Sequence, residues 1–361
     1  MTNYLLAGGG TAGHVNPLLA LADKIRQHEP QAKIFALGTP AGLETRLVPQ
    51  RGYELLTVPK LPLPRKPSPY ALKFPLALNA AIRSVQAMIQ QHKIDVVVGF
   101  GGYASAPAYL AASRSKVALV IHEANALPGF ANRLGARRAS AVAVAFSNTK
   151  LAAPRGGKPE HTGMPLRPEI EALLGAPRDP AAAKHFGLSS EQPILLVTGG
   201  SLGARSINNA VDASRNVLSA AGIQVLHIVG GKSDLAEEAN SSMVRIAYCD
   251  RMDLAIAAAD LAVARAGAST VSEFSAVGLP AVYVPYPVGN GEQAKNAQDS
   301  VAAGAAVLIA DADFTPEFVA SKLIPLASDA KRLAKMKSAA REVGISDATA
   351  RLYELVHEVA K

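Results

Sequence analysis

A short apolar strand, a glycine-rich turn and the start of a helix follow one another twice in this chain. In the first copy Tyr4–Leu6 precedes the turn Gly8–Gly13. In the second, about 190 residues later, Pro193–Thr198 precedes Gly199–Ala204 and a helix from Arg205. Glycines let the backbone approach a ligand closely, and a helix start offers unpaired N–H groups with partial positive charge. Each half of the chain therefore opens with a potential anion-binding turn.

Apolar strands alternate with helical patterns in both halves, which is typical of a parallel sheet covered by helices. In the first half the further predicted strands are Lys33–Leu37, Glu54–Val58, Asp95–Phe100, Val117–Ile121 and Ala141–Ala145. In the second half they are Gln224–Val229, Met243–Cys249, Leu261–Arg265, Ala281–Val284 and Ala306–Ile309. The predicted fold class is α/β, with ligands at the carboxyl ends of the strands.

Two domains are expected, because 361 residues exceed one ordinary core. Lys150–Pro168 is rich in Pro, Gly and Lys/Arg, and the boundary is placed near Gly163. The expected domains are residues 1–162 and 163–344, followed by a helix over 345–361. That helix carries Leu352 and Val356 on one face, and we expect it to pack back on the first domain.

The net charge of +8 is unevenly distributed. Residues 1–162 hold 19 Lys/Arg against 7 Asp/Glu, whereas residues 163–361 hold 18 against 22. Between Glu54 and Asp95 every charged residue is basic: Lys60, Arg65, Lys66, Lys73, Arg83 and Lys93. This asymmetry indicates an anionic partner for the first half.

Within that basic stretch, Pro59–Pro75 alternates Leu, Tyr and Phe with prolines and cations. It is either a solvated connector or a surface segment that enters the interface of an anionic membrane. Nucleic acid ranks below both, because aromatics are sparse and no binding signature is present. No apolar run approaches the ~18 residues of a membrane-spanning helix. The single cysteine fits a reducing cytoplasm. The first predicted strand begins so early that we expect no signal peptide before it.

His14 follows the first glycine-rich turn, and we expect Asn16 to cap the helix with Pro17 in its first turn. The glycine spacing also matches the dinucleotide fingerprint. However, Gly38 and Thr39 stand where an NAD site needs an acid, so NAD is a minor alternative. A phosphate site needs no histidine, whereas a reaction that transfers a proton can use one. His14 is therefore a candidate base or a simple capping or core residue.

Glu123 and Asn125 follow another strand of the same predicted sheet and could share a cleft with His14. In the second half, Arg265–Glu273 follows a strand and begins a helix whose first amides and hydroxyls can hold a diphosphate without a metal. Glu273, one turn further, could accept bonds from the vicinal hydroxyls of a ribose. An ordinary capped helix is the alternative. We expect Asp311 and Asp313 to form a turn or cap rather than a metal site.

Six segments in this order and spacing together resemble the MurG family of bacterial N-acetylglucosaminyltransferases, over essentially the whole chain. They are Gly9–His14, Gly101–Tyr103, His122–Asn125, Gly199–Ala204, Arg265–Glu273 and Gln293–Ala297. The resemblance implies the GT-B fold, in which two Rossmann-like domains face a cleft. It also implies inverting transfer of N-acetylglucosamine from UDP-N-acetylglucosamine to the N-acetylmuramyl 4-hydroxyl of lipid I, forming lipid II in peptidoglycan synthesis.

The resemblance carries over a set of donor contacts and two candidate catalytic residues. The donor contacts are Thr11, Ala12, Gly13, Asn125, Arg167, Ser201, Cys249, Ala268, Ser269, Thr270, Val271, Ser272, Glu273 and Gln293. Ser201 and residues 268–272 are implied to hold the diphosphate, Glu273 the ribose, the Cys249 backbone the uracil, and Gln293 the sugar. His14 is implied as base or acceptor orienter, with Glu123 the rival base. Neither a metal nor a cofactor is expected.

The same resemblance places the basic first half against the diphosphate of lipid I and the anionic inner leaflet of the cytoplasmic membrane. The chain would then be a peripheral protein on the cytoplasmic side, with no nucleic-acid partner. Two other functions stay open: a glycosyltransferase with another nucleotide sugar and acceptor, and a non-catalytic nucleotide-binding module.

Overall fold

The computed structural model describes residues 2–64 and 66–361, which form two compact units. Unit 1 runs to Arg167 and includes Asp347–Lys361, and unit 2 is Pro168–Ser346. The chain thus crosses between the units after residues 167 and 346, and not after 162 and 344 as the sequence indicates. Of the basic segment, Arg65 lies outside the described residues.

Hydrogen bonds explain why residues 163–167 belong to unit 1. The ring Nε2 of His122 lies 2.9 Å from the carbonyl oxygen of Gly163. The N–H of Leu166 donates to the hydroxyl of Thr349, in the last helix, at 3.2 Å. These bonds hold the segment against both the sheet and the C-terminal helix of unit 1.

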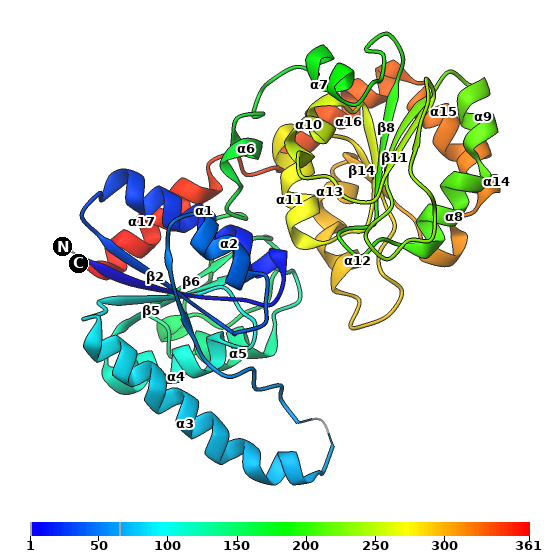
Figure 1. Ribbon diagram of the computed structural model, residues 1–361. Coiled ribbons are helices and arrows are strands. Elements are labelled where there is room, and N and C mark those ends of the chain that lie inside the picture. The colour runs from blue at the N-terminus through cyan, green and yellow to red at the C-terminus, as the bar shows by residue number, and fades with distance from the viewer. Residues whose placement is uncertain (1, 65) are drawn as a thin grey trace. The chain divides into compact units, whose positions relative to one another are not determined.

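Unit 1 contains a seven-stranded parallel sheet in the order β3-β2-β1-β4-β5-β6-β7 (Figure 1). Its strands are β1 Asn3–Ala7, β2 Lys33–Gly38, β3 Glu54–Thr57, β4 Val96–Gly99, β5 Ala118–Glu123, β6 Ala141–Val144 and β7 Glu160–His161. Its helices are α1 Ala12–His28, α2 Glu44–Gln50, α3 Pro69–Gln91, α4 Ser105–Ser115, α5 Phe130–Ala136 and α17 Ala348–Ala360, with a 3₁₀ turn η1 at Pro154–Gly156. Helices α1, α2 and α17 pack on one face, and α3, α4 and α5 on the other.

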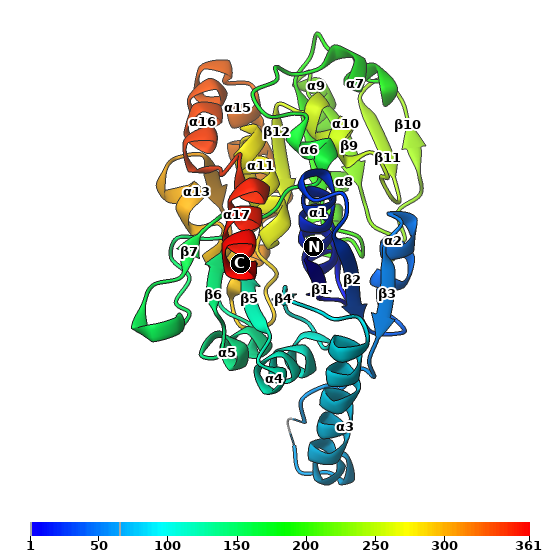
Figure 2. The same cartoon turned by 90° about the vertical axis from the view of Figure 1, so that its left-hand side faces the viewer.

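The last helix, α17, lies beside α1 in unit 1 (Figures 1 and 2). Leu352 and Val356 are fully buried in the core that α1 and the sheet share. The carboxylate of Glu29, just past α1, accepts hydrogen bonds from the Tyr4 and Tyr353 hydroxyls at 2.9 and 3.2 Å. Apolar packing and a polar cluster therefore both hold the C-terminus in unit 1.

Unit 2 repeats the architecture with the strand order β10-β11-β9-β8-β12-β13-β14, in which only β10 is antiparallel to its neighbour. Its strands are β8 Ile194–Thr198, β9 Gln224–Ile228, β10 Glu238–Ala239, β11 Met243–Ile246, β12 Leu261–Ala264, β13 Ala281–Tyr283 and β14 Ala306–Leu308. Its first helices are α6 Pro168–Glu171, α7 Pro180–His185, α8 Arg205–Ala213, α9 Arg215–Ala220, α10 Met252–Ala258 and α11 Ala268–Val277. The later helical segments are α12 Glu292–Asn296, α13 Gln298–Ala302, η2 Asp311–Asp313, α14 Pro316–Phe318, η3 Val319–Leu323, α15 Ile324–Ala327 and α16 Ala330–Val343. The predicted α/β class with parallel sheets is confirmed.

Helix α1 begins earlier than the sequence indicates, so the expected cap at Asn16 is wrong. The Thr11 carbonyl already accepts the N–H groups of His14 and Val15, at 3.1 Å each, and Thr11 is the N-cap residue. Pro17 lies inside the helix. Since proline has no N–H, it cannot bond to the carbonyl of Gly13, four residues earlier.

Helix α3 is buried only in its second half, where Ala81, Ile82, Val85 and Ile89 pack on unit 1. Its first half projects beyond the rest of that unit (Figures 1 and 2). Of the helices in the described part of the chain, none is long and apolar enough to cross a membrane.

Candidate functional site

Three turns of unit 1 meet at the carboxyl ends of β1, β4 and β5, where His14 lies. The His14 Nδ1 is 3.1 Å from the carbonyl oxygen of Gly9 and 3.4 Å from the Thr11 hydroxyl. A carbonyl oxygen only accepts, so Nδ1 carries the proton of the neutral ring. The lone pair of Nε2 is then the one left to take a proton.

Glycines in the β4–α4 turn allow it to contact this histidine. Gly102 has a φ of +89°, and a Cβ there would lie 2.6 Å from the Gly9 carbonyl oxygen. A Cβ on Gly101 would lie 3.2 Å from Nε2 of His14 and 3.6 Å from Nδ2 of Asn132. Side chains at either position would push the turn off the imidazole.

Glu123, at the end of β5, is 2% exposed and holds its own loop. Its carboxylate accepts hydrogen bonds from the N–H groups of Asn125 and Gly129 and from the side-chain amide of Asn132, each at 2.9 Å. Burial raises the pKa of this carboxyl, although the three donors act in the opposite direction. The geometry is that of a loop anchor with most of its acceptor sites in use.

The buried carboxylate of Glu44 anchors the first glycine-rich turn, a role that the sequence analysis missed. It accepts from the Gly10 N–H at 2.8 Å, and from the N–H and hydroxyl of Thr39 at 2.8 and 2.9 Å. Burial raises the pKa of this carboxyl, but these hydrogen bonds outweigh burial and hold the pKa below its usual value. The side chain is 1% exposed. Thr39 and Glu44 thus fasten the turn that precedes His14.

In unit 2, a pocket of about 760 Å³ opens at the carboxyl ends of the strands. Its lining includes Ser201 in the second glycine-rich turn, Arg265 after β12 and Gln293 on α12. Gln293 Oε1 accepts the N–H of Tyr286 at 2.9 Å. Its amide NH₂ is the group that remains to donate to a ligand.

Arg265 links the segments that line this pocket. Its role was not predicted from the sequence. Its guanidinium donates to the Val284 and Pro285 carbonyls, to the Ser206 hydroxyl and to the Asp311 carboxylate at 2.5–3.1 Å. Asp311 is therefore an ion-pair partner in a short 3₁₀ turn, and Thr315 caps the following helix. Among the described residues, no group of three His, Cys, Asp or Glu side chains could hold a metal ion.

Helix α11 begins at Ala268, as the sequence predicts, with Gly267 at its N-cap. The N–H of Val271 bonds to the Gly267 carbonyl, and the amides before it precede the first intrahelical bond. The Ser269 Oγ is buried and finds no hydrogen-bond partner among the described residues. Asn296 donates to the Ala266 carbonyl at 3.2 Å and so holds the turn before the helix. A bound anion could accept hydrogen bonds from the first amides of α11 and from the Ser269 hydroxyl.

The other predicted residues are distributed around these two sheet edges. In unit 1, Thr11 and Ala12 are exposed, Gly13 and Asn125 are half-buried, and Arg167 is the last residue before the chain enters unit 2. In unit 2, Cys249 is buried beyond β11, which ends at Ile246 and not at the predicted Cys249. Glu273 is 8% exposed. Residues 268–273 and Cys249 are not among the described residues lining the 760 Å³ pocket.

Comparisons with known proteins agree over nearly the whole chain. Models of the glycosyltransferase family 28 N-terminal and C-terminal domains match residues 4–144 and 194–352. The UDP-N-acetylglucosamine–N-acetylmuramyl-(pentapeptide) pyrophosphoryl-undecaprenol N-acetylglucosamine transferase of Clavibacter sepedonicus is 56% identical over 359 residues, 99% of this chain and 96% of its own. The Streptomyces coelicolor protein of the same name is 49% identical, covering 99% and 98%. The crystal structure of Acinetobacter baumannii MurG matches with a TM-score of 0.77 at 27% identity, over 99% of this chain and 100% of its own.

Proposed function

The chain belongs to glycosyltransferase family 28. From its similarity to transferases that are named for this reaction, we propose that it transfers N-acetylglucosamine from UDP-N-acetylglucosamine to lipid I, forming lipid II. Both relatives named above carry one transferase name, which favours this reaction over another sugar acceptor or a non-catalytic module. The direct test is an assay of UDP release and lipid II formation with lipid I as acceptor. Turnover of a simple lipid or polyketide acceptor in place of lipid I would contradict the proposal.

We assign donor binding to the carboxyl edge of unit 2. The observation that carries this assignment is the start of α11, where the first amides precede the first intrahelical bond and the Ser269 hydroxyl finds no partner among the described residues. Such a helix start stabilises the diphosphate both in the bound donor and as UDP leaves. In this assignment Ser201 and residues 268–272 contact the diphosphate, Glu273 the ribose, Gln293 the sugar hydroxyls, and the Cys249 backbone the uracil. Arg167, Thr11, Ala12, Gly13 and Asn125 are the further donor contacts proposed.

We assign the proton transfer to His14. The acceptor hydroxyl attacks the anomeric carbon, UDP leaves from the opposite side, and Nε2 of His14 takes the hydroxyl proton. Two observations favour His14 over Glu123: the Gly9 carbonyl sets its tautomer, and Glu123 already accepts three hydrogen bonds. In this assignment the role of Glu123 is to hold the loop that carries Asn125 in place.

Single substitutions distinguish the two candidates. We expect His14→Ala to lower kcat by about 10²- to 10⁴-fold, the usual contribution of a general base, with little change in UDP affinity. Glu123→Gln keeps the shape and one acceptor oxygen, so a smaller loss is expected. The assignment is wrong if His14→Ala retains near-full kcat while Glu123→Gln loses several orders of magnitude.

We further propose that the first half of α3 meets an anionic membrane surface. Leu72 and Leu76 are 83% and 76% exposed and lie one helical turn apart, and Leu63 precedes them at 46%. Lys66 and Lys73, in the same segment of the chain, are also exposed. Each cation near an anionic leaflet contributes ~1 kcal/mol, and inserted leucines add apolar burial. This makes unit 1 the side that reaches the lipid-linked acceptor.

Vesicle co-sedimentation tests this surface with two matched changes. Replacing Lys66 and Lys73 by Ala should weaken binding to phosphatidylglycerol vesicles by roughly tenfold or more, because ~2 kcal/mol of attraction is removed. Leu72→Ser with Leu76→Ser should weaken it as well, whereas Val217→Ser, at an exposed apolar position of unit 2, should not. Equal binding to neutral phosphatidylcholine vesicles would remove the electrostatic part of the proposal.

A further inference from the structure

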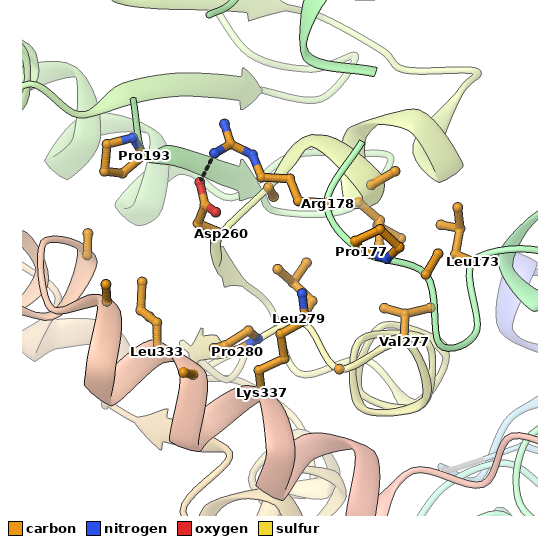
Figure 3. A pocket seen from close by; sticks show the side chains of 18 of the residues that line it. Leu173, Pro177, Arg178, Pro193, Asp260, Val277, Leu279, Pro280, Leu333 and Lys337 are labelled. Atoms are coloured by element: carbon orange, nitrogen blue, oxygen red, sulfur yellow. Dashed lines mark ion pairs between the residues drawn. The ribbon is translucent and has the colours of Figure 1, made fainter. Parts of the chain in front are cut away.

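Unit 2 has a second pocket, of about 400 Å³, at the amino ends of its strands and thus at the edge opposite the donor assignment (Figure 3). The starts of β8, β12 and β13, the segment before α7, and α16 surround it. Most of its walls are apolar: Leu173, Pro177, Pro193, Ile256, Val277, Leu279, Pro280 and Leu333. This volume and lining are typical of a small-molecule site.

An ion pair at one side of the pocket is already complete. The Arg178 guanidinium lies 3.1 Å from the Asp260 carboxylate and donates to the Ala258 and Gln192 carbonyls at 2.9 and 3.0 Å. The same carboxylate accepts the Ile194 N–H at 2.9 Å. Arg178 and Asp260 therefore satisfy one another and the ends of the neighbouring elements.

Lys337 is different, because its ammonium group lacks such a partner. It extends from α16 toward Leu279 (Figure 3). The part of the chain that the structure describes gives it neither an ion pair nor a hydrogen bond. Burial lowers the pKa of Lys337 most, the charges of Arg341 and Arg178 act in the same direction, and the Asp260 carboxylate acts in the opposite one. The geometry thus leaves one partly desolvated cation in an apolar pocket.

At the two helix ends that face this pocket, several of the terminal carbonyls are already hydrogen-bonded. Helix α11 ends with Gly278 at a φ of +81°, and the Leu279 N–H donates back to the Phe274 carbonyl at 2.8 Å. The Phe274 and Ser275 carbonyls are therefore satisfied within the helix end. The Ala258 carbonyl at the end of α10 is taken by Arg178. Arg178 and Asp260 pair with one another, so the other charged residues of the lining are Lys337 and Glu191, which is exposed and accepts the Ser190 hydroxyl.

We propose that this pocket binds a small amphipathic anion, whose apolar body contacts the leucine and proline side chains and whose carboxylate, sulfonate or phosphate pairs with Lys337. A nucleotide fits poorly, since the described lining residues include neither an aromatic ring for a base nor a glycine-rich turn for a diphosphate. The site is separate from the donor pocket, with which it shares none of the described lining residues.

Anilinonaphthalene sulfonate (ANS) is a suitable probe, because it joins an aromatic body to one anionic group and fluoresces when shielded from water. The intact protein should show saturable ANS binding that an excess of UDP does not displace. Lys337→Met keeps the apolar stem but removes the charge, and should weaken this binding by about tenfold or more. Lys337→Arg should restore it to within about threefold.

Lys335→Met is the matched control, because Lys335 lies on the exposed side of the same helix and should leave ANS affinity unchanged. Urea unfolding of each variant establishes that the fold is retained. Equal ANS affinity in Lys337→Met and Lys335→Met, or displacement of ANS by UDP, would overturn the proposal. Neither result would bear on lipid II synthesis, so the two proposals fail independently.

Discussion

At the scale of single residues, two buried carboxylates of unit 1 shape loops through backbone N–H groups. Glu44 accepts from Gly10 and Thr39, and Glu123 from Asn125 and Gly129. Both are at most 2% exposed. Their contribution is to position neighbouring groups, because an accepted N–H both orders a loop and occupies a lone pair.

Glu44→Gln tests that positioning role. An amide NH₂ would face the N–H of either Gly10 or Thr39, so one donor loses its acceptor, at a cost of about 1–3 kcal/mol. We expect kcat to fall roughly tenfold or more in steady-state assays, while the affinity of unit 2 for UDP is unchanged. Glu54→Gln, at an exposed position of β3, is the control. An unchanged kcat per folded molecule would show that Glu44 only stabilises the fold.

His122 should make stability depend on pH. Burial lowers its pKa from 6.5 to about 4. The unfolded chain takes up the proton near pH 6.5 and the folded chain does not, so the free energy of unfolding decreases as pH falls from 6.5 towards 4. Between pH 7.5 and 5.0 the expected loss is about 2 kcal/mol. Urea unfolding of His122→Phe should show a weaker pH dependence, and His28→Gln an unaltered one.

The sequence predicts site residues where they follow strands, as His14, Glu123 and Ser269 do, because parallel strands bring such positions to one edge. It does not predict Glu44 as a loop anchor, since 34 residues separate it from Gly10. Nor does it predict the hydrogen bonds of Arg265, because its partners lie far apart in the sequence and come together only in the folded sheet.

At the scale of elements, the strands are predicted well because strands buried on both faces are continuous apolar runs, as in the fully buried β4. The start of α1 is predicted poorly. Asn16 and Pro17 are good local signals for a helix start, but the Thr11 carbonyl begins the helix earlier. The tertiary structure of the turn that carries His14 therefore overrides the local preference for a helix start at Asn16.

The start of α11 yields a prediction for donor affinity. Ser269→Ala removes a hydroxyl that we assign to the charged diphosphate, so UDP affinity by calorimetry should fall roughly tenfold, as for a lost hydrogen bond to a charged group. Ser321→Ala removes an exposed hydroxyl that bonds to the Glu317 carbonyl and should have no effect. Equal affinities in the two variants would exclude Ser269 as a ligand.

At the scale of the whole molecule, the chain has separate apolar cores in its two units. The repeated strand, glycine-rich turn and helix predicts this duplication. The positions of the crossings are not predictable from composition, because they depend on the hydrogen bonds of Gly163 and Leu166 within unit 1.

Separate cores predict two unfolding transitions. Leu352→Ala should destabilise unit 1 alone by about 2–5 kcal/mol, the usual cost of truncating a fully buried leucine. Added UDP should raise only the transition of unit 2. Calorimetry with peptide-level hydrogen exchange identifies each transition, and Glu354→Ala on the exposed side of α17 is the control. A single transition that shifts as a whole would contradict this expectation.

The return of α17 to unit 1 also determines what a break in the backbone would do. A nick after Arg167 leaves an amino-terminal fragment that lacks one helix and a carboxyl-terminal fragment that carries it. The second fragment would thus hold the missing piece of the first, with Leu352 and Val356 as its apolar anchor. The two fragments form a natural pair for reconstitution after separate expression.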